Sequence, residues 1–288
     1  MVEDSVIIIP IYKKELSAFE KASLIQCIKI LKAYDVALIC PVSLDLENYD
    51  RIFKAYKKEY KIVRFEDKHF ESIFSYNLLM LSPFLYEQFL DYKYMLIYQL
   101  DAWVFEDKLE YWCNKDFDYI GAPWFDLENG FNLVEYSGNG GLSLRKVETM
   151  YQITSSKPFL KPDFETIYTK LKSKNKLLNF FIEPISMLIS MFSKKYTPIR
   201  VSKKFNRNED TILSNDAKQL IPNLKVAKGN IALDFSFEGF PSRAYKLNNN
   251  KLPFGCHGFM KYEWDGFWRK FINVDENIIE TQGVGIGV

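Results

Sequence analysis

Tyr94-Met95-Leu96-Ile97-Tyr98-Gln99-Leu100-Asp101 is an apolar run that delivers one carboxylate directly after it. Such a run predicts a buried strand, and Asp101 then lies at the carboxyl end of that strand. In an open α/β sheet, ligands bind in the crevice outside the carboxyl ends of the strands. A single Asp after a strand can also serve only to cap the next helix. The role of Asp101 therefore depends on what the rest of the chain places beside it.

Upstream of this run, strand-like and helix-like segments alternate. The expected strands are 6–9, 36–40 and 61–65, and the expected helices are 16–34, 49–60 and 70–92, the last interrupted at Ser82-Pro83. This alternation is typical of βαβ units and predicts an α/β fold with a mostly parallel central sheet.

The composition indicates a soluble globular protein, with 48% hydrophobic and 26% charged residues among 288. A net charge of +1 gives no reason to expect nucleic acid as a partner. The 16% of aromatic residues fits either a cleft that binds sugars or bases or an aromatic core. The four cysteines are widely spaced and predict reduced thiols, and no basic signal-peptide region is visible. We therefore expect a cytoplasmic protein.

No repeat or low-complexity linker divides the chain, which predicts a single domain over 1–270 and a C-terminal tail over 271–288. A helical insertion is expected at 172–205. Its segment 177–192 is apolar but too short to span a membrane, and lysines flank it at positions 172, 174, 176, 194 and 195. Two interpretations stay open: a helical hairpin packed on the body beside the acceptor cleft, or an amphipathic element at the inner face of a membrane.

Downstream of Asp101, three further motifs carry chemistry. They are the turn Ser137-Gly138-Asn139-Gly140-Gly141, the acidic pair Glu209-Asp210, and His257, which lies between the glycines at positions 255 and 258. Transfer of a sugar from a nucleotide donor requires a metal ion or fixed cations that stabilise the departing diphosphate. Asp101 is an oxygen ligand suited to Mg²⁺ or Mn²⁺. His257 is either a second ligand, a donor to a phosphate oxygen, or a structural turn histidine.

Sugar transfer also needs a carboxylate that takes the proton of the acceptor hydroxyl. Asn208 precedes an apolar stretch as a possible N-cap, which places Glu209 and Asp210 in the first turn of a helix. The two acids either stabilise the helix or supply the base, and we predict Asp210 as the base with Glu209 in support. The helix N-terminus is expected to lower the pKa of Asp210.

The glycine turn lacks the spacing of dinucleotide sites and the Lys of a phosphate-binding loop. It fits a platform under a sugar, with the Asn139 amide available to sugar hydroxyls. A plain hairpin turn is the alternative.

Together, these segments resemble the family catalogued as domain of unknown function 5672, which looks like a branch of the GT-A glycosyltransferases. The segments that carry the resemblance are 98–102, 119–124, 138–145, 208–210 and 255–258. The resemblance runs from about Val6 to about Trp268 and implies a Rossmann-like nucleotide-sugar domain. It implies that Asp101 takes the place of the last Asp of the DxD metal motif, Asp210 that of the base, and His257 that of a late metal or diphosphate ligand.

One departure from this pattern is Gln99, which stands where the first acid of DxD is found. Because Gln is neutral, we expect Mn²⁺ or Mg²⁺ to bind weakly through Asp101 and His257, or the enzyme to work without metal.

The sequence thus predicts a glycosyltransferase that moves a sugar from a nucleotide sugar, a UDP-sugar being favoured, to a hydroxyl of a glycan or lipid-linked glycan. The pathway expected is synthesis of a cell-surface polysaccharide such as capsule, O-antigen or LPS, with inversion at the anomeric carbon. Predicted donor contacts are Pro10, Tyr12, Arg64, Tyr76, Asn77, Gln99 and Asp101. Predicted acceptor contacts are Trp124, Asn139, Gly140, Gly141, Trp264 and Trp268.

Two competing functions remain at this point. A sugar nucleotidyltransferase would need a Gly-rich basic loop after the first strand, which residues 10–13 do not provide. A non-catalytic glycan-binding module would bind sugar without a nucleotide donor.

Overall fold

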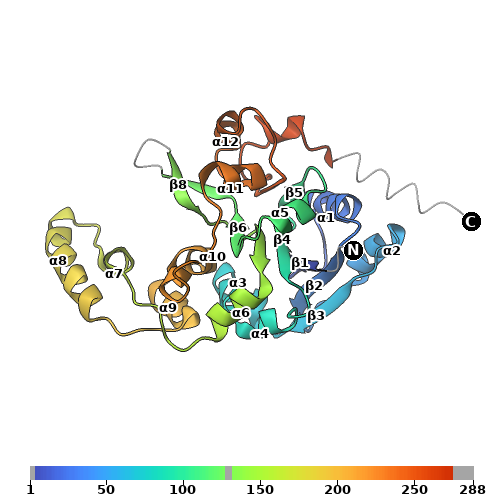
Figure 1. Ribbon diagram of the computed structural model, residues 1–288. Coiled ribbons are helices and arrows are strands. Elements are labelled where there is room, and N and C mark those ends of the chain that lie inside the picture. Colours follow the sequence, from blue (N-terminus) through green and yellow to red (C-terminus); the bar gives the residue numbers. More distant parts are fainter. Residues whose placement is uncertain (1–3, 127–131, 275–288) are drawn as a thin grey trace, which may run out of the picture.

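The computed structural model describes residues 4–126 and 132–274, and its centre is a six-stranded sheet of order β3-β2-β1-β4-β9-β6 (Figure 1). The strands are β1 (Ser5–Pro10), β2 (Asp35–Pro41), β3 (Lys61–Phe65), β4 (Tyr94–Tyr98), β6 (Tyr119–Gly121) and β9 (Leu142–Lys146). The first four in space, β3 to β4, are parallel, and β9 runs antiparallel to both of its neighbours. The predicted α/β fold with a mostly parallel sheet is confirmed.

Both faces of the sheet are covered by helices, which explains why its inner strands β1, β2 and β4 are almost entirely apolar and buried. In β1, Ile7 and Ile9 enter one core, whereas Val6 and Ile8 enter the other. The first core includes side chains of α1 (Ala18–Ile30), α2 (Glu47–Ala55) and α5 (Leu109–Asn114). The second includes side chains of α3 (Ile73–Met80), α4 (Pro83–Glu87) and α6 (Val147–Ser155).

Local signals set the helix ends. A capping box between Ser17 and Glu20 begins α1, and the expected break at Ser82-Pro83 separates α3 from α4, with Pro83 in the first turn. The helix expected over 49–60 ends at Ala55, because Lys57 adopts a left-handed backbone with φ of 51°.

Smaller elements cover the carboxyl edge of the sheet. The strands β5 (Ala102–Val104), β10 (Ser236–Phe237) and β11 (Gly255–His257) form a second sheet, and β7 (Pro123–Asp126) pairs with β8 (Asn132–Ser137). The helices here are α10 (Glu209–Ser214), α11 (Gly229–Phe235) and α12 (Pro241–Leu247), and single 3₁₀ turns lie at Asp67–Phe70, Asp216–Gln219 and Trp268–Lys270. Because β11 pairs with β5 in antiparallel register, His257 lies opposite Ala102, one residue after Asp101.

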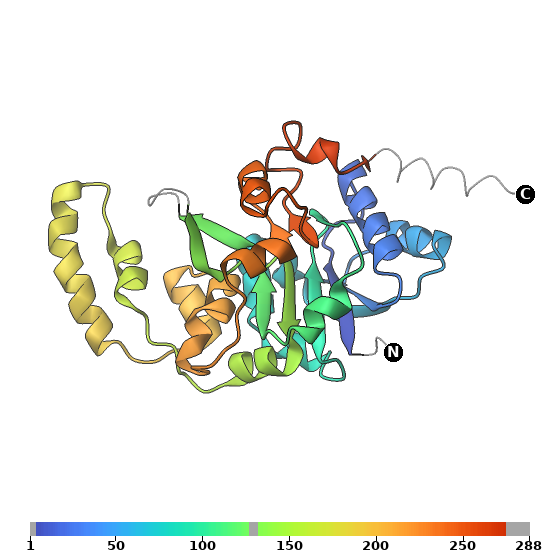
Figure 2. The same ribbon diagram turned by 45° about the horizontal axis from the view of Figure 1, so that its top comes forward.

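The insertion expected at 172–205 forms α8 (Lys176–Phe192) and α9 (Pro198–Phe205), and α7 (Phe164–Leu171) directly precedes it. Helix α8 continues through Pro184 and forms a hairpin with α7 at one end of the molecule, away from the central sheet (Figures 1 and 2). None of the described helices is long and apolar enough to cross a bilayer. Of the predicted tail, residues 275–288 lie outside the described residues.

Candidate active site

The carboxyl end of β4 and the beginning of β9 meet at one edge of the central sheet. Tyr98 pairs with Leu142, and the Gln99 amide donates to the Gly141 carbonyl at 2.9 Å. The strand-end segment with Asp101 and the glycine turn therefore lie side by side, as the order of motifs in the sequence suggested.

Asp101 holds two cationic partners. Its Oδ1 lies 3.0 Å from His257 Nε2, and its Oδ2 accepts from Lys261 Nζ at 2.7 Å. Burial raises the pKa of Asp101, but the hydrogen bonds and charges of His257 and Lys261 outweigh that effect and hold it well below its usual range. Asp101 is therefore ionised at any physiological pH.

His257 links this carboxylate to two further side chains. Its Nδ1 lies 3.1 Å from Glu238 Oε1, and its Nε2 lies 3.1 Å from Gln99 Oε1. Burial lowers the pKa of His257, but the hydrogen bonds to Asp101 and Glu238 raise it to about 9. The imidazole is thus protonated at neutral pH and can donate from both nitrogens.

Arg145 and Glu209 form a second charged pair, which is completely enclosed. Arg145, on β9, is 0% exposed and donates to both carboxylate oxygens of Glu209, at 3.0 and 3.1 Å. Its other donors reach the Ser143 hydroxyl at 3.0 Å and the Tyr86 hydroxyl at 3.2 Å. Both carboxylate oxygens of Glu209 are therefore engaged by Arg145.

Asp210, the next residue, has a different environment. Its Oδ1 accepts from the Thr211 amide at 2.7 Å, and no donor among the described residues contacts its Oδ2. Burial and the charge of Glu209 raise its pKa to about 7, although Thr211 and Arg145 act in the opposite direction. The expectation of a lowered pKa was wrong, because the short helix α10 cannot offset burial beside another carboxylate. A half-protonated carboxylic acid with one free oxygen is suited to proton transfer near neutral pH.

The glycine turn makes room for both charged pairs. A Cβ on Gly140 would lie 2.2 Å from Glu209 Oε1, and one on Gly141 would lie 2.0 Å from His257 Nε2. The Asn139 amide, expected to be available to sugar hydroxyls, donates to Glu238 at 2.6 Å, and its oxygen accepts from the Gly141 amide at 2.9 Å. The turn therefore holds the side chains of the site in place, and a contact with sugar remains a prediction.

The predicted donor contacts fall into two groups. Pro10 ends β1 at the ligand edge of the sheet, and Tyr12 follows it with 60% of its surface exposed. Tyr76, on α3, lies near the Gln99 side chain. Burial raises the pKa of Tyr76, and Gln99 acts in the opposite direction. Arg64 differs from these, because its Nη1 donates to three backbone carbonyls of the loop after β2.

Helix α3 also contacts the start of α10. The side-chain amide of Asn77 donates to the Asn208 side-chain oxygen at 3.4 Å. Asn208 is the N-cap residue of α10, as expected, but its side chain makes no capping hydrogen bond to the helix. This contact places Asn77 beside the start of α10, which carries Glu209 and Asp210.

Three tryptophans were predicted to stack on the acceptor, and the prediction for Trp268 was wrong. Its side chain is 0% exposed inside an aromatic cluster with Phe105 and Phe237, so no ring face is left for a glycan. Trp264 is half-buried and packs edge-on against Phe19 with ring centroids 4.9 Å apart. Trp124 covers Gly138, where a Cβ would lie 1.9 Å from its ring. For these two, acceptor contact remains a prediction.

A divalent ion fits the Asp101 cluster only with help from a ligand. The distances from His257 Nε2 to Asp101 Oδ1 and Gln99 Oε1, 3.0 and 3.1 Å, match the separation of about 3 Å between neighbouring ligands on octahedral Mg²⁺. However, the set contains one carboxylate, and the described residues include no group of three or more His, Cys, Asp or Glu suited to a metal. These donors fit an ion whose other ligands are phosphate oxygens.

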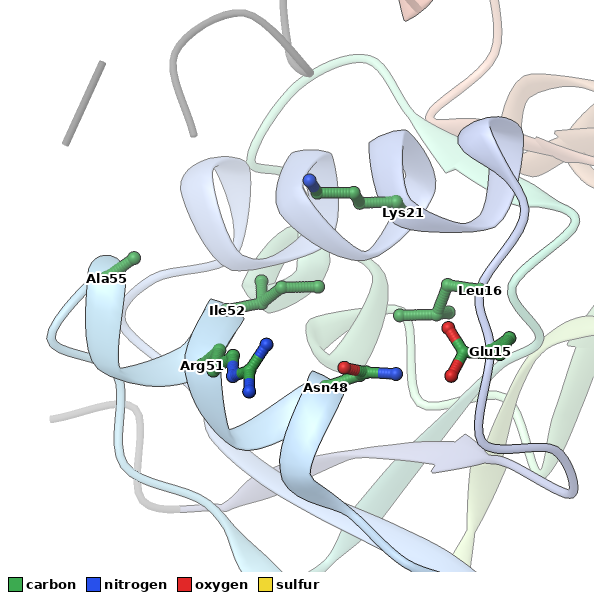
Figure 3. A pocket seen from close by; sticks show the side chains of 7 residues that line it. All are labelled: Glu15, Leu16, Lys21, Asn48, Arg51, Ile52 and Ala55. Atoms are coloured by element: carbon green, nitrogen blue, oxygen red, sulfur yellow. The ribbon is translucent and has the colours of Figure 1, made fainter. Parts of the chain in front are cut away.

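A surface cavity of about 380 Å³ lies between the start of α1 and α2 (Figure 3). Its lining residues are Glu15, Leu16, Lys21, Asn48, Arg51, Ile52 and Ala55. None of them belongs to either charged pair of the site, so the cavity is separate from the chemistry described above.

Sequence reasoning missed three charged residues of the site: Arg145, Glu238 and Lys261. Arg145 had a detectable signal, since a cation inside a short strand that follows a glycine turn requires a partner if the strand is buried. Lys261 follows His257 by four residues, but only the turn at Gly258, with φ of 66°, brings it back to Asp101. Glu238 had no signal of its own.

Comparison with solved structures shows a shared fold. The apo-form glycosyltransferase GlyE of Streptococcus pneumoniae matches with a TM-score of 0.50 at 11% identity, over 98% of this chain and 64% of that one. The chain thus spans less than two thirds of the GlyE structure. A galactosyltransferase, LgtC, in complex with donor and acceptor sugar analogs, matches with a TM-score of 0.49 at 13% identity, over 98% of this chain and 97% of that one.

The similarity to GlyE shows a shared fold, in agreement with the GT-A-type α/β fold expected from the sequence. No curated protein matches the sequence. A family profile, however, covers residues 59–257. That range includes the carboxyl edge of β4, the glycine turn, the acidic pair and His257. The chain therefore belongs to the family described as "Protein of unknown function (DUF5672)".

Proposed function

We propose that this protein is an inverting glycosyltransferase that moves a sugar from a nucleotide-sugar donor to a hydroxyl of a glycan, with Asp210 as the base. One observation carries the proposal. A carboxylate with a free oxygen and a pKa of about 7 shares a site with a carboxylate held by His257 and Lys261 at the ligand edge of a GT-A sheet.

The reaction needs a base that takes the proton of the acceptor hydroxyl and a site that stabilises the negative charge of the leaving diphosphate. Ionised Asp210 accepts the proton of the acceptor hydroxyl as its oxygen bonds to the anomeric carbon. The bond from that carbon to the diphosphate breaks, and the diphosphate leaves with the electron pair. A pKa near the working pH suits this role, because the base is then both available and strong enough.

Glu209 acts in this proposal by positioning. Its bidentate contact with buried Arg145 fixes the first turn of α10, and its charge helps to raise the pKa of Asp210. The pair therefore sets both the place and the basicity of the neighbouring carboxylate.

The leaving diphosphate is received at the Asp101 cluster. Lys261 and protonated His257 are cations there, and each can donate to a phosphate oxygen. A bound Mn²⁺ or Mg²⁺ would supply additional charge neutralisation, held by Asp101, Gln99 and the diphosphate, and His257 would join them only after losing the proton on Nε2. Calorimetry should show weak Mn²⁺ binding without nucleotide and tighter binding with UDP, and tight binding to the free protein would contradict this donor set.

We further propose a UDP-sugar as donor, a glycan or lipid-linked glycan of the cell surface as acceptor, and action in the cytoplasm. Tyr12, Tyr76 and Asn77 are the side chains proposed to contact the nucleotide. Their support is position: they lie at the end of β1 and on α3, beside Gln99 and Asn208.

The test is a comparison of donor binding and turnover. A thermal-shift panel of UDP, GDP, CMP and dTDP sugars, with and without Mn²⁺, identifies the donor. Asp210→Asn should then lower turnover about 10³-fold while donor affinity stays within about twofold, because a base acts only in the transition state. Asp91→Asn, at an exposed site beyond the opposite edge of the sheet, is the matched control and should be unaffected.

Other outcomes separate the alternatives. Release of pyrophosphate from a nucleoside triphosphate and a sugar phosphate would indicate a nucleotidyltransferase. Glycan binding without any nucleotide response would indicate a binding module. Proton NMR of the product decides the stereochemistry, and an anomeric configuration equal to that of the donor would overturn the inverting mechanism.

A further inference from the structure

Three polar residues of α8 lie on the face of the helix that is turned to the rest of the protein. Ser186 is completely buried, whereas Asn179 and Ser190, on the same face at spacings of seven and four, are half-buried. The Asn179 side chain is bonded at both ends to the backbone of Ser173, at 2.7 and 2.9 Å, which fixes the start of α8 to the loop after α7. The face turned to the protein therefore holds small polar side chains together with Ile182, which is half-buried.

The opposite face of α8 is apolar and turned to solvent. Residues at spacings of three and four form a stripe that is 50% to 80% exposed: Leu178, Phe181, Ile185, Leu188 and Phe192. Phe180, Met187 and Met191 widen this stripe and are 75%, 59% and 61% exposed. We call these eight residues the α8 apolar face. A contiguous exposed surface of this kind marks an interaction site.

Positive charge surrounds the α8 apolar face. The insertion 172–205 holds eight lysines and arginines and one acidic residue, so it carries +7 in a chain whose net charge is +1. Lys172 and Lys174 precede α8, Lys194 and Lys195 follow it, and all four are exposed. None of the four pairs with an acidic residue that the structure describes.

We propose that the α8 apolar face docks on an anionic lipid bilayer, with the helix lying in the interface and its flanking lysines on lipid phosphates. At 17 residues, α8 is about 25 Å long, shorter than a hydrocarbon core of about 30 Å. Cations at both ends keep both ends at the same water interface. An amphipathic helix with basic flanks binds membranes in this orientation.

A second copy of the chain is a less suitable occupant. A helix-to-helix seam is a narrow apolar stripe with charged residues on its two sides. In α8, Phe180, Met187 and Met191 lie beside the stripe, so the surface is broader than such a seam needs. The breadth of the face and the net positive charge both match lipid.

Docking would also place the active site. Helix α9 follows the hairpin, and only residues 206–208 separate α9 from α10, which carries Asp210. The bilayer would thus lie at a fixed position relative to the proposed base. The inference itself concerns lipid binding alone and does not rest on the proposed function.

Vesicle flotation of the full chain tests the proposal. Phosphatidylcholine vesicles with about 30% phosphatidylglycerol should bind it at least about tenfold better than phosphatidylcholine alone. The triple variant Phe181→Ser, Leu188→Ser, Phe192→Ser should lose binding about tenfold or more. The matched control Phe84→Ser, Leu90→Ser, which alters side chains that are 67% and 45% exposed elsewhere, should bind as the wild type does.

The charged flank is tested separately. Lys194→Gln, Lys195→Gln should lower binding to the anionic vesicles about tenfold. Circular dichroism should confirm that each variant is folded. Equal vesicle binding by the wild type and the triple variant would overturn the proposal. Absence of binding to the anionic vesicles would overturn it too, and a dimer seen by analytical ultracentrifugation that the triple variant abolishes would then identify a second copy of the chain as the occupant.

Discussion

The candidate active site and the α7–α8 hairpin differ in which side chains they bury and which they leave exposed. In the site, Arg145 is 0% exposed and Glu209 is 4% exposed, and their charges are paired at 3.0 and 3.1 Å. On the hairpin, Phe180 and Phe192 are 75% and 80% exposed, while Ser186 is buried. One region encloses charge, and the other exposes hydrocarbon.

Neither arrangement is favourable for folding alone. Enclosing an ion pair costs desolvation, and leaving apolar side chains in water forgoes the gain from burial. The enclosed pair is satisfied within the chain and fixes the start of α10 to β9, whereas the exposed apolar side chains of α8 have no comparable partner in the part of the chain that the structure describes. Variants that test this contrast should differ widely in effect.

The largest effect is expected from Arg145→Met. It leaves the Glu209 carboxylate buried without a partner, and breaking a buried ion pair in this way costs about 3–5 kcal/mol. Urea denaturation should show this loss in the free energy of unfolding. The double variant Arg145→Met, Glu209→Leu removes both charges and should recover most of it, and a double variant as unstable as Arg145→Met would show that packing rather than charge is at stake.

A smaller effect, mainly on activity, is expected from Gly141→Ala. The new methyl would lie 2.0 Å from His257 Nε2, so the imidazole must move away from Asp101. Displacement of a charge stabiliser by about 1 Å lowers turnover about 10²-fold. Gly239→Ala is the matched control, since nothing lies within 4 Å of its added methyl, and it should keep full activity. Equal activity of the two variants would show that His257 has no part in turnover.

The fold could be predicted because its signals are local. The apolar runs of β1, β2 and β4 are buried on both sides, and strands that alternate with helices in this way typically form a mostly parallel sheet. Helix ends were less certain. The helix expected over 49–60 stops at Ala55, where a single left-handed residue overrides the periodicity.

The site could be predicted only where a residue follows a strand or a glycine turn. Asp101 and His257 lie together because the end of β4 and the strand β11 converge at one edge of the sheet, and the roles assigned to them and to Asp210 stay predictions. The pKa of Asp210 was missed, since burial and a neighbouring charge depend on contacts distant in sequence. Lys261 was missed for the same reason: its contact with Asp101 spans 160 residues.

The pH dependence of Asp210 gives a moderate effect in both activity and stability. Turnover should rise as the pH increases through about 7, because the base must be ionised. Stability should change in the opposite direction. The folded protein keeps Asp210 protonated above its ordinary pKa of 3.8, so the stability present at low pH is lost as the pH rises through about 7.

Asp210→Asn should therefore melt roughly 2–4 °C above the wild type at pH 8, with a smaller difference at pH 5, as scanning calorimetry would show. Asp91→Asn, which changes an exposed carboxylate, should show no such dependence. If Asp210→Asn melts below the wild type at pH 8, the carboxylate is stabilised by its surroundings and its pKa is not raised.

The smallest effect is expected on the hairpin, where Phe181→Ser should change the free energy of unfolding by no more than about 0.5 kcal/mol. Phe181 is 65% exposed, so folding buries little of it and its removal creates no cavity. Ser186→Leu, on the buried face of the same helix, should instead destabilise by about 1–3 kcal/mol, because a larger side chain must be forced against α7. Urea denaturation of the two variants measures both. A large loss for Phe181→Ser would mean that its ring packs within the chain in solution, and the contrast between the two regions would then disappear.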